Sequence, residues 1–186
     1  MALRIRTKWR TGGPKTIEQR AGVVGVTIWK IAQETCRRME KDDWPLGSDR
    51  QFVAVLTEFV AFLLQVTDRI VYGQLSEDDR RALINALGVH LARTAESNLL
   101  DYLGPGDHVN AFIATLNARA ADYAECDYTD AGPSYAFLRL LGEKTADAMA
   151  ATDSKWVLEQ VMEIEAPEML EPLRRVVGEV LGVKVK

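Results

Sequence analysis

The sequence predicts an all-α fold of about seven helices, packed as one compact bundle-like or orthogonal array around a central apolar helix. Apolar residues recur at three- and four-residue steps through most of the chain, which is the period of one helical face. No segment alternates apolar and polar residues for long enough to form a strand. The chain length of 186 residues fits one domain with a core of its own.

The first helix is predicted over residues 16–41. Thr16 and Gln19 form a capping-box pattern, in which each side chain bonds the backbone N–H of the other residue. The apolar face that follows consists of Ile17, Ala21, Val24, Ile28, Ile31, Thr35 and Met39. Residues 23–29 are also rich in β-branched side chains, so a short strand stays open there as an alternative.

The central helix is predicted over residues 49–72, approximately. Ser48 and Gln51 repeat the capping-box pattern, and Gly73 supplies a stop signal. The helix is apolar nearly all round, apart from one narrow stripe made of Gln51, Glu58, Gln65 and Arg69. Such a helix is buried on most sides, so we expect the others to pack around it. Its interrupting charges predict a core helix and not a membrane span.

The later helices are predicted from their start and stop signals. Ser76 and Asp107 cap the third and fourth helices, which Gly104-Pro105-Gly106 separates. A polar loop is expected over residues 126–133. Three further helices are then expected over about 134–151, 154–165 and 168–181, with Pro167 at the start of the last one.

Charged residues are distributed unevenly along the chain. Residues 1–41 hold ten Lys or Arg against three Asp or Glu, a net of +7, and the remainder has a net of −11. Residues 1–15 contain Gly12-Gly13-Pro14 and no lasting apolar period. The sequence therefore predicts a basic, mobile N-terminal arm over residues 1–15 and a single helical domain over residues 16–186. The absence of a signal-peptide pattern leads us to expect a soluble, cytoplasmic protein.

Few residues suggest catalysis or metal binding. The two cysteines, Cys36 and Cys126, are far apart, which excludes a CxxC pair and a cysteine-based zinc site. The two histidines occur without the Glu-x-x-His pattern of di-iron bundles, and no phosphate-loop or nucleophile-elbow motif is present. We expect neither a metal nor a cofactor, and no catalytic residue can be named.

A ligand site between the second, third and fourth helices is the alternative to a purely interacting protein. Five polar residues could converge there if the second and third helices pack antiparallel: Glu58, Gln65, Asp68, His90 and Asn98. A pocket that holds Glu58 beside His90 would favour a small-ligand- or metal-binding protein, possibly an enzyme.

Residues 18–29 resemble the turn and second helix of a helix-turn-helix module, as in TetR-type regulators. Ala21-Gly22-Val23 and Thr27-Ile28-Trp29 carry this resemblance, which covers about twelve residues. It implies DNA binding through residues 16–41, and the positive charge of this end fits phosphate contacts. Residues 1–15, however, contain no apolar period for the helix that must precede such a module. Nucleic acid is therefore a second alternative.

The first prediction for function is a non-enzymatic interaction, adaptor or assembly protein. Its partner would be another protein or a second copy of the chain. Tryptophans flanked by basic residues are frequent interaction anchors. The candidate interaction residues are Arg4, Arg6, Lys8, Trp9, Arg10 and Trp44.

Overall fold

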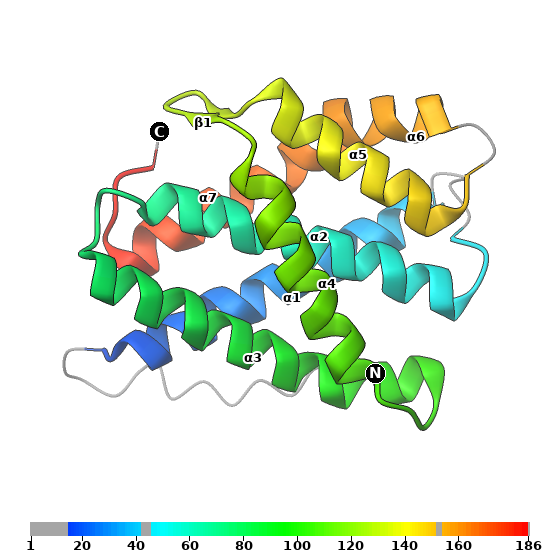
Figure 1. Cartoon of the computed structure of the whole chain (residues 1–186), viewed down its shortest axis with the longest axis horizontal. Coiled ribbons are helices and arrows are strands. Elements are labelled where there is room, and N and C mark those ends of the chain that lie inside the picture. The colour runs from blue at the N-terminus through cyan, green and yellow to red at the C-terminus, as the bar shows by residue number, and fades with distance from the viewer. Residues whose placement is uncertain (1–14, 42–45, 152–153, 186) are drawn as a thin grey trace.

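The structure is a computed structural model, and it describes residues 15–41, 46–151 and 154–185. Its elements are α1 (Ile17–Lys41), α2 (Asp49–Val71), α3 (Glu77–Leu103), α4 (His108–Ala124), β1 (Tyr128–Thr129), β2 (Gly132–Pro133), α5 (Tyr135–Met149), α6 (Ser154–Gln160), the π-helical turn η1 (Val161–Glu165) and α7 (Ala166–Leu181). The predicted all-α class is confirmed (Figure 1).

Helix α2 is the central element of the fold, as its composition predicts. Sixteen of its 23 residues are buried, and it contacts α1, α3, α4, α5 and α7. In Figure 1, α4 crosses in front of α2 and α1 crosses behind it, while α5 and α6 lie above it and α3 below it. Every helix in the described part of the chain is too short or too polar to serve as a membrane span.

The predicted helix starts are formed by local hydrogen bonds. The Thr16 hydroxyl accepts from the Gln19 N–H at 3.3 Å, and the Gln19 side chain accepts from the Thr16 N–H at 3.2 Å. At the second predicted capping box, the Ser48 hydroxyl accepts from the Gln51 N–H at 3.3 Å. The Gln51 amide instead donates to the Met149 carbonyl at 2.8 Å, so it joins α2 to the end of α5.

The C-terminal helices differ from the prediction. Helices α6 and α7 are joined without a break through η1, so residues 154–181 form one continuous helical segment where two separate helices were expected. Pro167 suggests a boundary because it lacks an N–H group. In the structure, a π turn precedes Pro167 and the helix does not end there. The Ala166 N–H bonds the Val161 carbonyl five residues back, and this widened turn continues into α7.

The predicted loop over residues 126–133 contains a small hairpin. Strands β1 and β2 pair antiparallel, with Tyr128 opposite Pro133 and Thr129 opposite Gly132. Beneath them, the Phe137 ring stacks on Tyr123 at 4.4 Å between centroids and meets Tyr128 edge-on at 5.9 Å. These aromatic contacts seat the hairpin on the helical core.

Three arginines, which we call the arginine clamps, each pair with two carboxylates. The clamps are Arg38 with Glu165 and Glu168, Arg80 with Asp68 and Glu77, and Arg119 with Glu58 and Asp122. Each clamp joins different helical elements: Arg38 joins α1 to η1 and α7, Arg80 joins α3 to α2, and Arg119 joins α4 to α2. Buried carboxylates such as Glu165 and Glu58 need such partners, because an uncompensated charge is costly away from water.

Candidate cationic binding cleft

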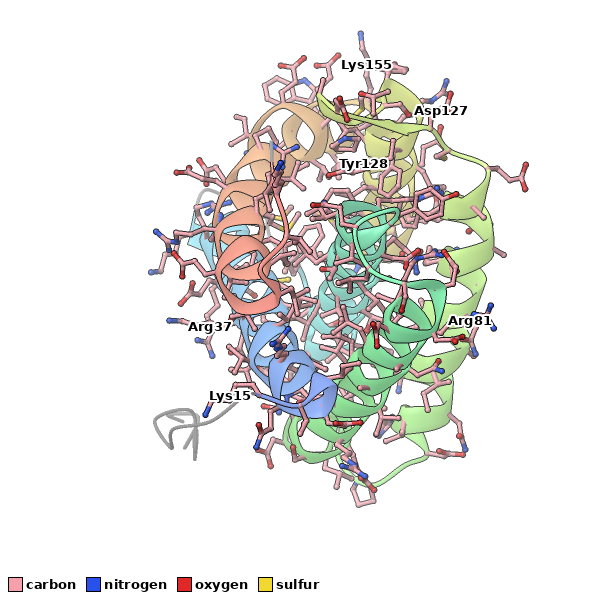
Figure 2. All side chains as sticks on the ribbon, turned by 90° about the vertical axis from the view of Figure 1, so that its left-hand side faces the viewer. Lys15, Arg37, Arg81, Asp127, Tyr128 and Lys155 are labelled. Carbon is pink, nitrogen blue, oxygen red and sulfur yellow. The ribbon has the colours of Figure 1, made fainter. Side chains whose placement is uncertain are left out.

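Positive side chains gather where the end of α2, the hairpin, α7 and the C-terminal segment meet. A cleft of about 460 Å³ lies there. Among the described residues that line it, three are cations, Arg69, Arg174 and Lys184, and one is a carboxylate, Asp130. We call this hollow the cationic cleft. Figure 2 faces this side of the molecule, with Tyr128 of the hairpin between α7 and α4.

Arg174 reaches the cleft from α7. Its Nε atom is buried and has no hydrogen-bond acceptor among the described residues. Its Nη2 atom lies against Gly132, where an added Cβ would collide with it. Gly132 also has a φ of 114°, which side-chain-bearing residues rarely adopt. Glycine at this position therefore serves both the hairpin backbone and the close approach of the guanidinium.

Arg69 reaches the cleft from the last turn of α2. Its Nη2 atom donates to the carbonyls of Tyr123 at 2.8 Å and Cys126 at 3.4 Å. Carbonyls at the end of a helix lack partners within the helix, so Arg69 caps the end of α4 and fixes the start of the hairpin. Since these acceptors are neutral carbonyl oxygens, they leave the positive charge of Arg69 uncancelled.

The wall opposite the hairpin is built from the C-terminal segment. The Gln74 side chain donates to the Lys184 carbonyl at 2.9 Å and accepts from the Lys184 N–H at 2.7 Å. These two bonds fix the backbone at Lys184 beside the end of α2. Tyr72 stands at the rim with 64% of its surface exposed, and the Arg80 guanidinium lies 5.0 Å from the centre of its ring.

This arrangement suits an anion. Guanidinium groups donate paired hydrogen bonds to carboxylates and phosphates, and such charge-assisted bonds are stronger than neutral ones. An anion held between Arg69 and Arg174 would meet two guanidinium groups whose charge no described carboxylate cancels. The described lining contains neither histidine nor cysteine. Across the described residues, no group of three or more His, Cys, Asp or Glu side chains could hold a metal ion.

The ligand site predicted between α2, α3 and α4 has a hollow of its own, of about 440 Å³. Gln65 and Asp68 line this hollow, whereas Glu58, His90 and Asn98 are not among its lining residues. Asp68 accepts from Arg80 Nε at 2.8 Å and from Arg80 Nη2 at 2.7 Å. Its negative charge is therefore already compensated within the fold.

The other three candidates face different neighbours. Glu58 is buried and accepts from Arg119 Nε at 2.7 Å and from Arg119 Nη2 at 3.1 Å. Asn98 donates to the Thr94 carbonyl of its own helix at 2.7 Å. His90 packs against the glycines of α1, so it is directed away from the hollow that holds Gln65 and Asp68. The structure brings only those two of the five candidates together.

His90 occupies a notch in α1 made by Gly22 and Gly25. A Cβ on Gly25 would lie only 2.6 Å from His90 Cδ2, so the absence of a side chain there lets the imidazole approach the α1 backbone. Burial lowers the pKa of His90 below its ordinary value, and the charge of Arg93 lowers it further. Its buried Nε2 atom has no hydrogen-bond partner among the described residues. The position of His90 is therefore explained by its packing between α3 and α1.

The region that resembles a helix-turn-helix is one helix. Residues 17–41 form α1 without interruption, so the turn implied by the resemblance is absent, and the alternative of a strand over residues 23–29 is also wrong. Val24, Ile28 and Trp29 are buried within the fold. Tertiary packing along the whole apolar face keeps the segment helical. The candidate interaction residues Arg4, Arg6, Lys8, Trp9, Arg10 and Trp44 lie outside the described residues.

The sequence contains partial signals for the cationic cleft. Arg69 stands out as a polar residue on an apolar helix, and the loop at 126–133 is the longest predicted irregular segment within the folded part. Arg174 has no distinguishing signal, because an arginine on an amphipathic helix is ordinarily a solvated residue. Its role depends on the hairpin that packs beside it.

Comparison with other proteins adds no information about function. No protein-family model matches the sequence. Among curated proteins and among solved structures, none matches the chain at a significant level. The geometry of the cationic cleft is accordingly the basis for assigning a function.

Proposed function

We propose that this chain is a non-enzymatic interaction domain that binds an anionic group of a partner protein in the cationic cleft. The observation that carries the proposal is the pair of arginines, Arg69 and Arg174, which line one cleft and form no ion pair with a described carboxylate. Arg174 Nε also has no acceptor among the described residues, so the fold itself does not use the donors of this guanidinium in full. A carboxylate or a phosphate group has the right charge and geometry.

The contrast with the arginine clamps supports this assignment. Each clamp arginine pairs with two carboxylates, whereas no ion pair joins Arg69 or Arg174 to a carboxylate among the described residues. The cleft is thus a positive site on a chain whose net charge is −4. Such a site attracts anions and speeds their association, most strongly at low ionic strength.

The test is a titration with inorganic phosphate, followed by the ¹H–¹⁵N resonance of the Arg174 Nε–H group. An Arg174→Lys variant, which lacks this group, assigns the resonance. We expect a saturable shift of the Arg174 signal that weakens as sodium chloride is added, because added salt screens the attraction.

The matched control is Arg37, an exposed arginine on α1 that is labelled in Figure 2. Arg37→Gln removes the same charge and should leave the Arg174 titration unchanged. A shift at Arg174 that grows linearly and never saturates, or one that Arg37→Gln abolishes equally, would show general ionic attraction and overturn the proposal.

A further inference from the structure

A second hollow, which we call the apolar groove, adjoins the cationic cleft. It has a volume of about 700 Å³ and runs along α7 beside the hairpin and the start of α5. Its lining is mainly apolar, from Pro133, Leu138, Pro167, Leu170, Val183 and Val185. Arg175, Glu171 and Glu179 also line the groove, and their positions on α7 are exposed.

Two residues belong to both hollows. Arg174 and Val185 line the cationic cleft and also the apolar groove. Val185 packs against Gly178 of α7, where an added Cβ would lie 3.1 Å from Val185 Cγ2. A ligand that places an anionic group on Arg174 can therefore continue directly into the groove.

We propose that the partner supplies a short extended segment in which an acidic residue is followed by an apolar one. This inference rests on the proposed function of the cationic cleft and adds the partner's class. The carboxylate would meet the Arg174 guanidinium, and the apolar side chain would lie between Leu138 and Leu170. Charge complementarity selects this occupant over the chain's own residues 1–14, which carry four cations and no acidic residue.

The distance between Leu170 and Arg174 sets the spacing of the motif. These residues are four positions apart on α7, which corresponds to about 6 Å at about 1.5 Å of rise per residue. An extended chain covers that length in roughly two residues, at about 3.3 Å each. The apolar residue should therefore stand about two positions from the acidic one.

Synthetic peptides test this motif directly. The probe is a fluorescein-labelled octapeptide with one Asp, a Leu two positions later, and Ser or Gly elsewhere, blocked at its C-terminus by amidation. Fluorescence anisotropy should show saturable binding to the full chain. Replacing the Asp by Asn, or the Leu by Ser, should each weaken binding about tenfold, the equivalent of one charge-assisted hydrogen bond or one buried apolar side chain.

Variants of the protein then assign each half of the motif. Arg174→Gln should remove the preference for Asp over Asn and keep the preference for Leu over Ser. Leu138→Ser should do the reverse. Val183→Thr, which keeps the shape of the side chain, is the second groove variant in case Leu138→Ser fails to fold, which thermal melting would reveal. Arg37→Gln should retain both preferences.

The outcomes separate the two proposals. If the peptide's Leu is dispensable while Asp and Arg174 are required, the cationic cleft binds an anion but the inferred motif is wrong. If the Asp-to-Asn replacement has no effect, the proposed function fails as well. Decanoate, a small carboxylate with an apolar tail, is tested in parallel. Saturable decanoate binding without peptide binding would overturn the inference in favour of a small amphiphile.

Discussion

The arginine clamps and the cationic cleft use the same side chain in contrasting surroundings. At the clamp on α4, the Arg119 guanidinium pairs with Glu58 and Asp122, so its charge is cancelled inside the fold. In the cleft, Arg69 donates to carbonyl oxygens, and Arg174 Nε has no acceptor among the described residues. The clamps hold helices together, whereas the cleft keeps its positive charge available.

Under the proposed function, this difference separates residues that serve the fold from residues that serve binding. A paired arginine satisfies a buried carboxylate, so its removal leaves a charge that the fold cannot accommodate. An arginine without a carboxylate partner contributes little to the fold and costs desolvation. Active and binding sites commonly lower stability in this way. Stability measurements on variants of the two regions therefore test whether the two kinds of arginine differ in this way.

The largest expected effect is at a clamp. Arg119→Ala leaves Glu58 buried without its two hydrogen bonds, and we expect the free energy of unfolding to fall by about 3–5 kcal/mol. Urea denaturation measures this loss. The control is Arg139→Ala, an exposed arginine whose partner Glu143 is only half-buried, and which should cost only about 0–1 kcal/mol. Equal losses in the two variants would contradict the structural role assigned to the clamp.

An intermediate effect is expected at the glycine beside Arg174. Gly132→Ala forces a side chain into a φ of 114° and against the guanidinium, so it should cost about 1–3 kcal/mol. It should also weaken phosphate binding, because Arg174 must move. Gly88→Ala is the matched control: Gly88 lies within α3 with open space around its Cα, so alanine there should stabilise by up to about 1 kcal/mol. Unchanged stability and unchanged phosphate binding in Gly132→Ala would show that this glycine is dispensable.

The sequence predicts the regions governed by local rules. Helix α2 begins after its Ser48 cap and ends two residues before Gly73, as the capping signals indicate. The break expected near Pro167 is absent, because a π turn accommodates the missing N–H without ending the helix. No periodicity in a single sequence reports that choice, and the contact that Glu165 of this turn makes with Arg38 of α1 is equally without a local signal.

The candidate site is less predictable for a related reason. The polar residues of α2 are visible in the sequence, but their partners are not: Glu58 is bound from α4, not by His90, which packs against α1. Arg174 follows Arg69 by more than a hundred residues, and only the tertiary fold brings both to one cleft. Pairing across such distances in sequence has no local signature.

A third, pH-dependent effect is expected at the interface of α1 and α3, where His90 packs against Gly22 and Gly25. Burial lowers the pKa of His90, so between that lowered value and its ordinary value of about 6.5 the unfolded chain binds more protons than the folded one. The stability contributed by neutral His90 is therefore complete above about pH 6.5 and declines as the pH falls through this window. Urea midpoints at pH 7.5 and 5.5 should differ less in His90→Gln than in the original chain. An identical pH dependence in both would exclude His90 as its source.

The smallest effect on stability is expected at the cleft itself, and it tests the difference between the two regions most directly. Arg174→Gln removes the charge without leaving a carboxylate unpaired, so its stability should stay within about 0.5 kcal/mol of the original chain. The paired experiment is Arg174→Gln beside Arg119→Ala, with urea unfolding and phosphate titration measured on both. The clamp variant should lose stability and, where it remains folded, retain phosphate binding, whereas the cleft variant should do the opposite. If Arg174→Gln lost as much stability as Arg119→Ala, Arg174 would be a structural residue, and its unpaired Nε could not be assigned to a ligand.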